Sequence, residues 1–170
     1  MMKINVSQLK KNPGTTQAFS CKTSAGELGL DQPEVWTENM MVDGCVVNKG
    51  MIYAVSGEIR TTLNQCCSCC LEDMVTSLTI AFSEEYKEAG PASGDALALD
   101  INYFNGDEID ITDLVRENLL LAEPIKPVCS ASCRGLCPEC GVNLNTNTCG
   151  CNPVKVDPRL AVLEKLLVKD

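Results

Sequence analysis

Six cysteines lie within the 23 residues from Cys129 to Cys151, and their spacing constrains the fold of this part of the chain more than any other feature. The last four form a Cys-x2-Cys pair, Cys137 and Cys140, followed after eight residues by a Cys-x-Cys pair that begins at Cys149. Two such pairs can place four thiolates around one metal ion, since structural zinc is held tetrahedrally by closely spaced cysteines. The segment has too few apolar residues for a core of its own, so we expect it to fold around a metal.

The turn between Cys137 and Cys140 has the residues that a metal-binding knuckle needs. Pro138 restricts the backbone inside the turn, and Gly141 can take the left-handed conformation that turns backbone N–H groups toward a sulfur. Zinc is the expected metal, because a Cys-x-Cys second half is unusual for iron bound by four thiolates. We therefore predict a zinc-binding segment, or zinc ribbon, over residues 129–151.

A second group of cysteines lies at residues 66–70, in the order Cys-Cys-Ser-Cys-Cys. It contains two overlapping Cys-x2-Cys pairs, which are Cys66 with Cys69 and Cys67 with Cys70. Cys129 and Cys133 are not used by the four later cysteines, so one pair from residues 66–70 would complete a second tetrahedral site with them. The residues alone leave open which pair binds. They also leave open a thiol-redox or metal-handling role for the cluster from Cys66 to Cys70.

The twelve cysteines would suit a disulfide framework if the chain were secreted. The first 11 residues, however, lack the apolar stretch of a signal peptide. No run approaches the roughly 18 apolar residues of a membrane span. We expect a cytoplasmic protein with reduced, metal-binding thiols and no membrane partner, in which Cys21 and Cys45 are small buried residues and not ligands.

Residues 1–128 are predicted to form an α+β body of mainly antiparallel strands, either a sheet or a partly open barrel, with one internal helix. The predicted strands cover residues 16–22, 40–48, 51–62 and 73–87, and residues 2–11 suit a strand or a short helix. Lys49-Gly50 marks the turn of a hairpin between the second and third of these strands.

The internal helix is predicted to begin at Asp110, as its cap, and to end before Pro124, because apolar residues recur at helical spacing between them. Asp157 and Pro158 are typical of the start of a further helix. The predicted organisation is thus a body over residues 1–128, the cysteine-rich segment 129–151, and a C-terminal helix over 152–170.

The charge of the chain is uneven. Its net charge is −9, and residues 61–128 alone carry thirteen acidic and three basic side chains. This argues against broad binding of a phosphate backbone, which depends on Lys and Arg.

Nothing in the sequence points to catalysis. The chain has no histidine, and no serine-based triad, phosphate loop or dinucleotide fingerprint occurs. A closed site of four thiolates leaves no open position for water or substrate. We expect a protein that is not an enzyme, with no catalytic residues and no small-molecule substrate.

Several stretches resemble the YceD-like family, a bacterial and plastid group long classed as a domain of unknown function. They are Cys67-Ser68-Cys69-Cys70-Leu71-Glu72, residues 110–124, residues 135–145 and Asp157-Pro158-Arg159. The last two resemble the C-terminal zinc ribbon of Gram-positive members. In one departure, Cys69 stands where family members usually have arginine.

The resemblance implies a role in the accumulation of large-subunit ribosomal RNA, and hence in biogenesis of the large ribosomal subunit. Its register favours Cys67 and Cys70 as the ligands that join Cys129 and Cys133. The predicted zinc ligands are then Cys67, Cys70, Cys129, Cys133, Cys137, Cys140, Cys149 and Cys151, for two Zn²⁺ per chain. The implied partner is a ribosomal protein or a large-subunit rRNA assembly intermediate, and the acidic middle of the chain suits a basic ribosomal protein at least as readily as RNA.

Overall fold

The computed structural model describes residues 1–32, 35–37, 39–90, 102–151 and 159. Contacts divide the chain into two compact units. Unit 1 consists of Met1–Gln65 and Met74–Ile125, and unit 2 consists of Cys66–Asp73 and Lys126–Asp170. The predicted boundaries at residues 128 and 151 stay predictions, and the structure adds that the cysteines of residues 66–70 group with the later part of the chain. The predicted helix over residues 152–170 lies outside the described residues.

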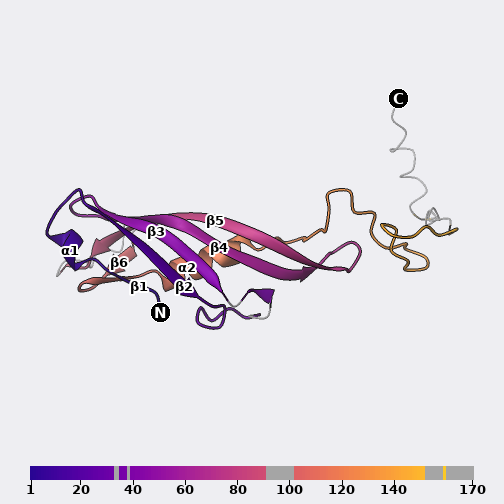
Figure 1. The fold of residues 1–170 in the computed structure, drawn as a ribbon, viewed down its shortest axis with the longest axis horizontal. Coiled ribbons are helices and arrows are strands. Elements are labelled where there is room, and N and C mark those ends of the chain that lie inside the picture. Colours follow the sequence, from indigo (N-terminus) through magenta and orange to yellow (C-terminus); the bar gives the residue numbers. More distant parts are fainter. Residues whose placement is uncertain (33–34, 38, 91–101, 152–158, 160–170) are drawn as a thin grey trace, which may run out of the picture. The chain divides into compact units, whose positions relative to one another are not determined.

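Unit 1 is built on a five-stranded sheet with the strand order β2-β3-β4-β5-β6 (Figure 1). The strands are β2 (Thr16–Thr23), β3 (Met40–Asn48), β4 (Tyr53–Cys66), β5 (Asp73–Glu88) and β6 (Asn102–Phe104). β3 is antiparallel to β2 and to β4, whereas β6 runs parallel to β5. The predicted α+β class is confirmed. The sheet is open, with β2 and β6 at its two edges.

The hairpin of β3 and β4 forms where the sequence predicts it. The backbone N–H of Lys49 donates to the carbonyl of Ile52 at 2.8 Å, and Gly50 has a φ of +97° that favours glycine. Asn48 is buried and secures the turn, because its side chain accepts from the Gly50 N–H and donates to the Leu9 carbonyl. Alternate residues of the two strands then face the core, among them Met40, Val42, Val46, Val55, Ile59 and Leu63.

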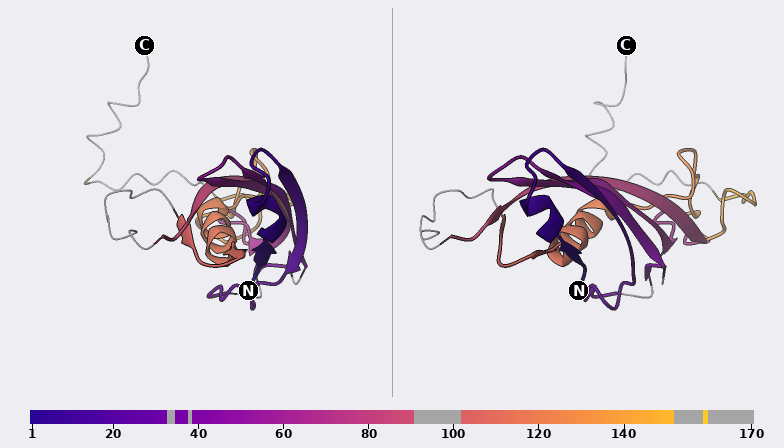
Figure 2. Two further views of the ribbon diagram at one scale, coloured as in Figure 1. Left: turned by 90° about the vertical axis from the view of Figure 1, so that its left-hand side faces the viewer. Right: turned by 60° about the vertical axis from the view of Figure 1, so that its left-hand side comes forward.

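A pair of glycines lets the sheet curve around the helix that it covers. Gly44 lies opposite Gly57 in the β3–β4 register, and the rings of Phe19 and Phe82 fill the space that side chains would take. A Cβ added at Gly57 would lie 2.3 Å from the Asp43 carbonyl oxygen and 2.8 Å from the Phe82 ring, so only glycine fits. Figure 2 shows the sheet wrapping around α2 (Thr112–Ala122).

A second, two-stranded sheet leads into this helix. β1 (Lys3–Asn5) pairs antiparallel with β7 (Glu108–Asp110), and α1 (Ser7–Lys10) follows β1. The helix α2 then buries Leu114, Val115 and Leu119 against the sheet. The sequence predicted Asp110 as the cap of this helix, and this is wrong, because α2 begins only at Thr112. The Asp110 carboxylate lies outside the helix and accepts the Thr112 N–H at 2.9 Å. Neither described helix has the length and apolar character that a membrane crossing requires.

Candidate metal centres

The structure brings four of the predicted ligands together in unit 2, in what we call the first thiol cluster: Cys67, Cys70, Cys129 and Cys133. All four sulfurs lie within 4.8 Å of one another. The Sγ atoms of Cys67 and Cys133 are 3.8 Å apart, and those of Cys70 and Cys129 are 3.6 Å apart. The cluster therefore joins two stretches of chain that are about sixty residues apart in sequence.

These distances fit a tetrahedral metal site. Four sulfurs held about 2.3 Å from a central zinc ion lie about 3.8 Å from one another. A disulfide would require about 2.05 Å between sulfurs, and every cysteine is a free thiol in the structure. The soft thiolate donors also suit zinc better than a hard cation. When bound, such an ion supplies cross-linking of the chain, because four protein ligands complete its coordination.

A tight backbone turn, which we call the first knuckle (residues 67–72), presents two of these sulfurs. The N–H of Cys67 donates to the carbonyl of Glu72, and the N–H of Leu71 donates to the carbonyl of Cys67, both at 2.9 Å. Leu71 has a φ of +61° and is the one described non-glycine residue with a positive φ. The N–H groups of Cys69 and Cys129 point at the Cys67 sulfur, at 3.5 and 3.3 Å.

Hydrogen bonds to sulfur shift the pKa values of the cysteines in the first thiol cluster in opposite directions. Backbone N–H groups, from Cys129 foremost and then from Cys70 and Cys69, lower the pKa of Cys67 to about 6. The side-chain amide of Asn145, 3.4 Å from the Cys133 sulfur, lowers the pKa of Cys133, with help from a backbone N–H. Hydrogen bonding with its neighbours Cys133 and Cys70 raises the pKa of Cys129 to about 12. Such a group holds four negative charges only when a cation compensates them.

The second thiol cluster consists of Cys137, Cys140, Cys149 and Cys151, again with all sulfurs within 4.8 Å of one another. Its knuckle, residues 137–142, has the same hydrogen bonds as the first: Cys137 N–H to the Val142 carbonyl at 2.8 Å, and Gly141 N–H to the Cys137 carbonyl at 2.9 Å. Gly141 has a φ of +73°. Backbone N–H groups of Cys140 and Glu139 lower the pKa of Cys137 to about 6, as others do for Cys67.

The remaining two cysteines of residues 66–70 lie outside both clusters. Cys66 is exposed and its Sγ lies 3.1 Å from a carboxylate oxygen of Asp73, which raises the pKa of this thiol. Cys69 contributes its backbone instead, because its carbonyl accepts the N–H of Leu136 at 3.1 Å. The geometry therefore groups Cys67 and Cys70, and not Cys66 and Cys69, with the cysteines that follow α2.

Two asparagines take part in unit 2 without having been predicted. Asn143 donates to the Glu72 carboxylate at 2.7 Å, which ties the first knuckle to the second half of the unit. Asn145 donates to the Cys133 sulfur and accepts the Arg134 N–H at 2.8 Å. In the sequence these residues appear as Asn143-x-Asn145 between the two cysteine pairs. This pattern cannot be told apart from asparagines that simply form turns.

The two cysteines of unit 1 take no part in either cluster. Cys21 was predicted to be buried, and it is half-buried and packs against the core. Cys45 was predicted to be buried, and this is wrong: it is half-buried, with its Sγ 3.6 Å from the hydroxyl of Ser56. Its position on β3 has the opposite parity from the buried Val42 and Val46, so it faces away from the core.

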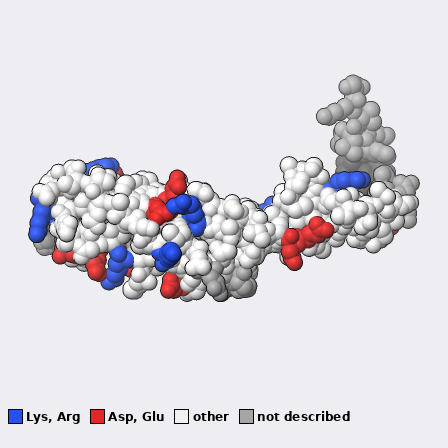
Figure 3. Space-filling view, viewed as in Figure 1, with Lys and Arg blue, Asp and Glu red and all other residues white. Residues whose placement is uncertain are grey.

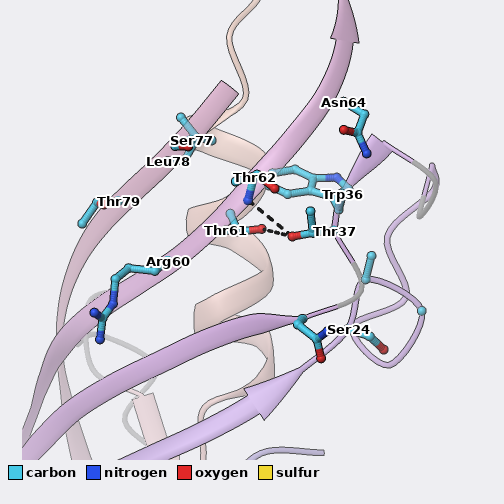
Figure 4. A pocket seen from close by; sticks show the side chains of 13 residues that line it. Ser24, Trp36, Thr37, Arg60, Thr61, Thr62, Asn64, Ser77, Leu78 and Thr79 are labelled. Carbon is cyan, nitrogen blue, oxygen red and sulfur yellow. Dashed lines mark hydrogen bonds between the residues drawn. The ribbon is translucent and has the colours of Figure 1, made fainter. Parts of the chain in front are cut away.

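Unit 1 also has a broad polar groove beside β4 (Figure 4). The hydroxyl of Thr37 lies 3.4 Å from the Thr61 hydroxyl and accepts the Thr62 N–H at 3.4 Å. Arg60 is the one charged residue among its described lining residues, and it is paired with Asp43. Its described lining residues do not include the paired titratable groups from which a catalytic site is built.

The fold and the clusters define a class: an α+β protein with two groups of four cysteines placed to bind metal ions. The chain belongs to the YceD family, described as large ribosomal RNA subunit accumulation protein YceD, whose family model matches residues 55–167. The resemblance inferred from the motifs is thereby confirmed.

The relatives span bacteria and plants. The uncharacterized protein Rv2926c of Mycobacterium tuberculosis is 25% identical over 173 residues, covering 98% of this chain and 81% of the relative. The chloroplastic large ribosomal RNA subunit accumulation protein YCED homolog 1 of Arabidopsis thaliana is also 25% identical, covering 80% of this chain and 52% of the relative. YlbN of Bacillus subtilis is 39% identical over 72 residues, 42% of each chain. No solved structure matches.

Proposed function

We propose that this protein is a non-catalytic, zinc-binding factor in biogenesis of the large ribosomal subunit, and that it supports accumulation of large-subunit rRNA in the cytoplasm. The observation that carries the proposal is the family match, which runs over residues 55–167 and so includes both thiol clusters. The name of the Arabidopsis relative supports the same role.

The proposed cofactor is one Zn²⁺ in each thiol cluster. The first would be held by Cys67, Cys70, Cys129 and Cys133, and the second by Cys137, Cys140, Cys149 and Cys151. Because four thiolates fill a tetrahedral site, neither ion would retain a position for water or substrate. This donor set supports a structural role for both ions and a protein that is not an enzyme.

The proposed partner is a ribosomal protein or an rRNA assembly intermediate of the large subunit. The test is affinity purification of the tagged, full-length protein from its own cells, with bound RNA and protein both identified. We expect large-subunit precursor rRNA together with large-subunit proteins. Depletion should lower large-subunit rRNA relative to small-subunit rRNA. Recovery of neither rRNA nor ribosomal proteins, with unchanged rRNA levels on depletion, would contradict the proposal.

One observation favours a second candidate, a thiol-redox or metal-handling role for residues 66–70. A pKa of about 6 would make Cys67 a thiolate at neutral pH, which is the reactive form. The pKa of the neighbouring Cys66 is raised, which argues against a part for Cys66 in such thiol chemistry. A readily formed disulfide between Cys67 and Cys70 in the purified protein would favour this candidate over the structural role.

A further inference from the structure

The second thiol cluster encloses a loop, residues 141–148, which we call the linking loop. It lies between the predicted ligands Cys140 and Cys149, so a metal ion in this cluster would close it at both ends. Within the loop, the N–H of Asn145 donates to the side chain of Asn143 at 2.9 Å, which holds the two asparagines in one turn. The position of both side chains is therefore set by the segment that the second cluster organises.

One asparagine of the linking loop supports a ligand of the first thiol cluster. The Asn145 side chain donates to the Cys133 sulfur at 3.4 Å and accepts the Arg134 N–H at 2.8 Å. A hydrogen bond to a ligating sulfur orients it and stabilises its thiolate form. Cys133 thus takes part of its environment from a loop that belongs to the other cluster.

The other asparagine ties the first knuckle to the same loop. Asn143 donates to the Glu72 carboxylate at 2.7 Å, and the N–H of Leu136 donates to the Cys69 carbonyl at 3.1 Å. Leu136 and Asn143 lie opposite each other in an isolated antiparallel bridge, so both contacts come from one small piece of structure. The knuckle that presents two ligands of the first cluster is therefore bonded to the segments on either side of the second knuckle.

Backbone atoms approach closely at this junction. Gly135 has a φ of +69°, and a Cβ added there would lie 3.0 Å from the carbonyl oxygen of Cys69. The N–H of Leu144, in the linking loop, donates to the Gly135 carbonyl at 2.9 Å. The junction is therefore built from main chain on both sides, which leaves it little conformational freedom.

Ion pairs do not contribute to this junction. Every ion pair among the described residues lies in unit 1, and Arg134 and Glu139 are the only charged side chains of residues 129–151. On the face that Figure 3 shows, the surface of this part of the chain is accordingly mostly uncharged. Hydrogen bonds depend on direction, so the junction forms only when the segments on both sides have their ordered conformation.

The dependence between the two clusters has a direction. The turns of the second cluster, which are its knuckle and the linking loop, are closed by hydrogen bonds within residues 137–151. The first cluster draws its cysteines from residues 67–70 and 129–133, and it takes further hydrogen bonds from the linking loop. The second cluster can therefore form from its own segment, whereas the first depends on an ordered linking loop.

We propose that the two metal sites load in order and cooperatively. The second thiol cluster binds its zinc ion first and holds the linking loop in place, which raises the affinity of the first thiol cluster for zinc. The inference rests on the zinc binding of the proposed function and deepens it, since it makes one site depend on the other. Because such coupling is reciprocal, an occupied first cluster also retains the ion of the second, and unit 2 becomes fully ordered only with both.

The test measures how far zinc protects each cysteine of the full-length protein from alkylation, by mass spectrometry of its peptides at buffered concentrations of free Zn²⁺. In the wild type, the second cluster should be protected at a lower concentration than the first. Cys140→Ser should raise the midpoint of the first cluster about tenfold, because the linking loop is no longer held. Cys69→Ser, which removes a thiol outside both clusters, is the matched control and should leave both midpoints unchanged. An unchanged first midpoint in Cys140→Ser, or earlier protection of the first cluster in the wild type, would overturn the proposal.

Asn145→Ala tests the connection without removing a ligand. Alone, it should raise the midpoint of the first cluster about tenfold. Combined with Cys140→Ser it should add little, since the amide supports Cys133 only while the linking loop is held. A combined rise of about a hundredfold, as independent effects would give, contradicts the coupling.

The same measurement separates the failure of this inference from the failure of the proposed function. If both clusters are protected but Cys140→Ser leaves the first midpoint unchanged, the coupling fails and the proposed zinc binding stands. If zinc protects neither cluster of the wild type, the proposed zinc binding itself fails.

Discussion

The two knuckles of unit 2 have the same backbone hydrogen bonds but differ at the residue that follows the second cysteine. The first knuckle has Leu71 at this position with a φ of +61°, and the second has Gly141 with a φ of +73°. A left-handed backbone costs an ordinary residue roughly 1–2 kcal/mol, and glycine avoids this cost. The leucine gains little from packing in return, since its side chain is 65% exposed. The comparison teaches that the geometry of four converging cysteines, more than local propensity, imposes the turn.

The clusters also differ in how far apart along the chain their ligands lie. The second thiol cluster draws all its cysteines from residues 137–151, whereas the first joins residues 67–70, before β5, to residues 129–133, after α2. The first cluster therefore cross-links distant parts of the chain, and the second organises a local loop.

The largest expected effect comes from removing one ligand of each cluster. Cys70→Ser and Cys140→Ser should each reduce the metal content by one ion per chain, since structural zinc contributes on the order of 10 kcal/mol of apparent binding free energy. Hydrogen exchange should then rise in residues 66–73 and 126–133 for Cys70→Ser, but in residues 137–151 for Cys140→Ser. Elemental analysis that still finds two ions in either variant would show that the sulfur is not a ligand.

A smaller effect is expected from Asn145→Ala, because this side chain donates to the Cys133 sulfur. Removing such a hydrogen bond to a ligand should weaken metal binding about tenfold at the first cluster only. Competition with a chromophoric chelator measures this affinity. Asn147→Ala is the matched control, since among the described residues the side-chain amide of Asn147 donates only to the Thr146 hydroxyl, at 3.1 Å. Equal affinities of the two variants would rule out a role for the amide.

Exchanging the residues at the left-handed positions tests the comparison of the knuckles directly. Gly141→Leu should destabilise the second cluster by about 1–2 kcal/mol, and Leu71→Gly should stabilise the first by about 1 kcal/mol or less. No atom lies within 4 Å of the position that a Cβ would take at Gly141, so the effect reports backbone strain. The denaturant concentration at which each metal is released is the measurement. A loss of stability in Leu71→Gly would mean that the leucine side chain contributes contacts.

The smallest effect, a change near zero, is expected for Cys66→Ser and Cys69→Ser. Neither sulfur belongs to a cluster, so both variants should retain the metal content of the wild type. Loss of an ion from either variant would transfer the ligand role to the overlapping pair of Cys66 and Cys69.

Local patterns explain what the sequence could predict. The bounds of β3, Met40–Asn48, match the prediction because its apolar residues alternate. The overlapping pairs of residues 66–70 have identical spacing, so only the family resemblance favoured Cys67 and Cys70. The structure shows why this pair is used. The first knuckle is closed by a hydrogen bond from the Cys67 N–H to the Glu72 carbonyl, and this bond fixes which two cysteines of residues 66–70 join the cluster.

Long-range pairing explains what the sequence could not predict. Ile4 of β1 lies opposite Ile109 of β7, and the parallel pairing of β6 with β5 also leaves no mark on local periodicity. The hydrogen bond from Asn145 to the Cys133 sulfur crosses from one cysteine set to the other, so spacing within either set does not show it.

The central claim is that eight of the twelve cysteines form two closed metal centres. Elemental analysis combined with thiol titration, on protein purified without oxygen, tests it most directly. The account predicts two zinc ions per chain and four readily reactive thiols, at Cys21, Cys45, Cys66 and Cys69, with the other eight becoming reactive only after a chelator removes the metal. Fewer than two ions per chain, or a disulfide between Cys67 and Cys70, would contradict it.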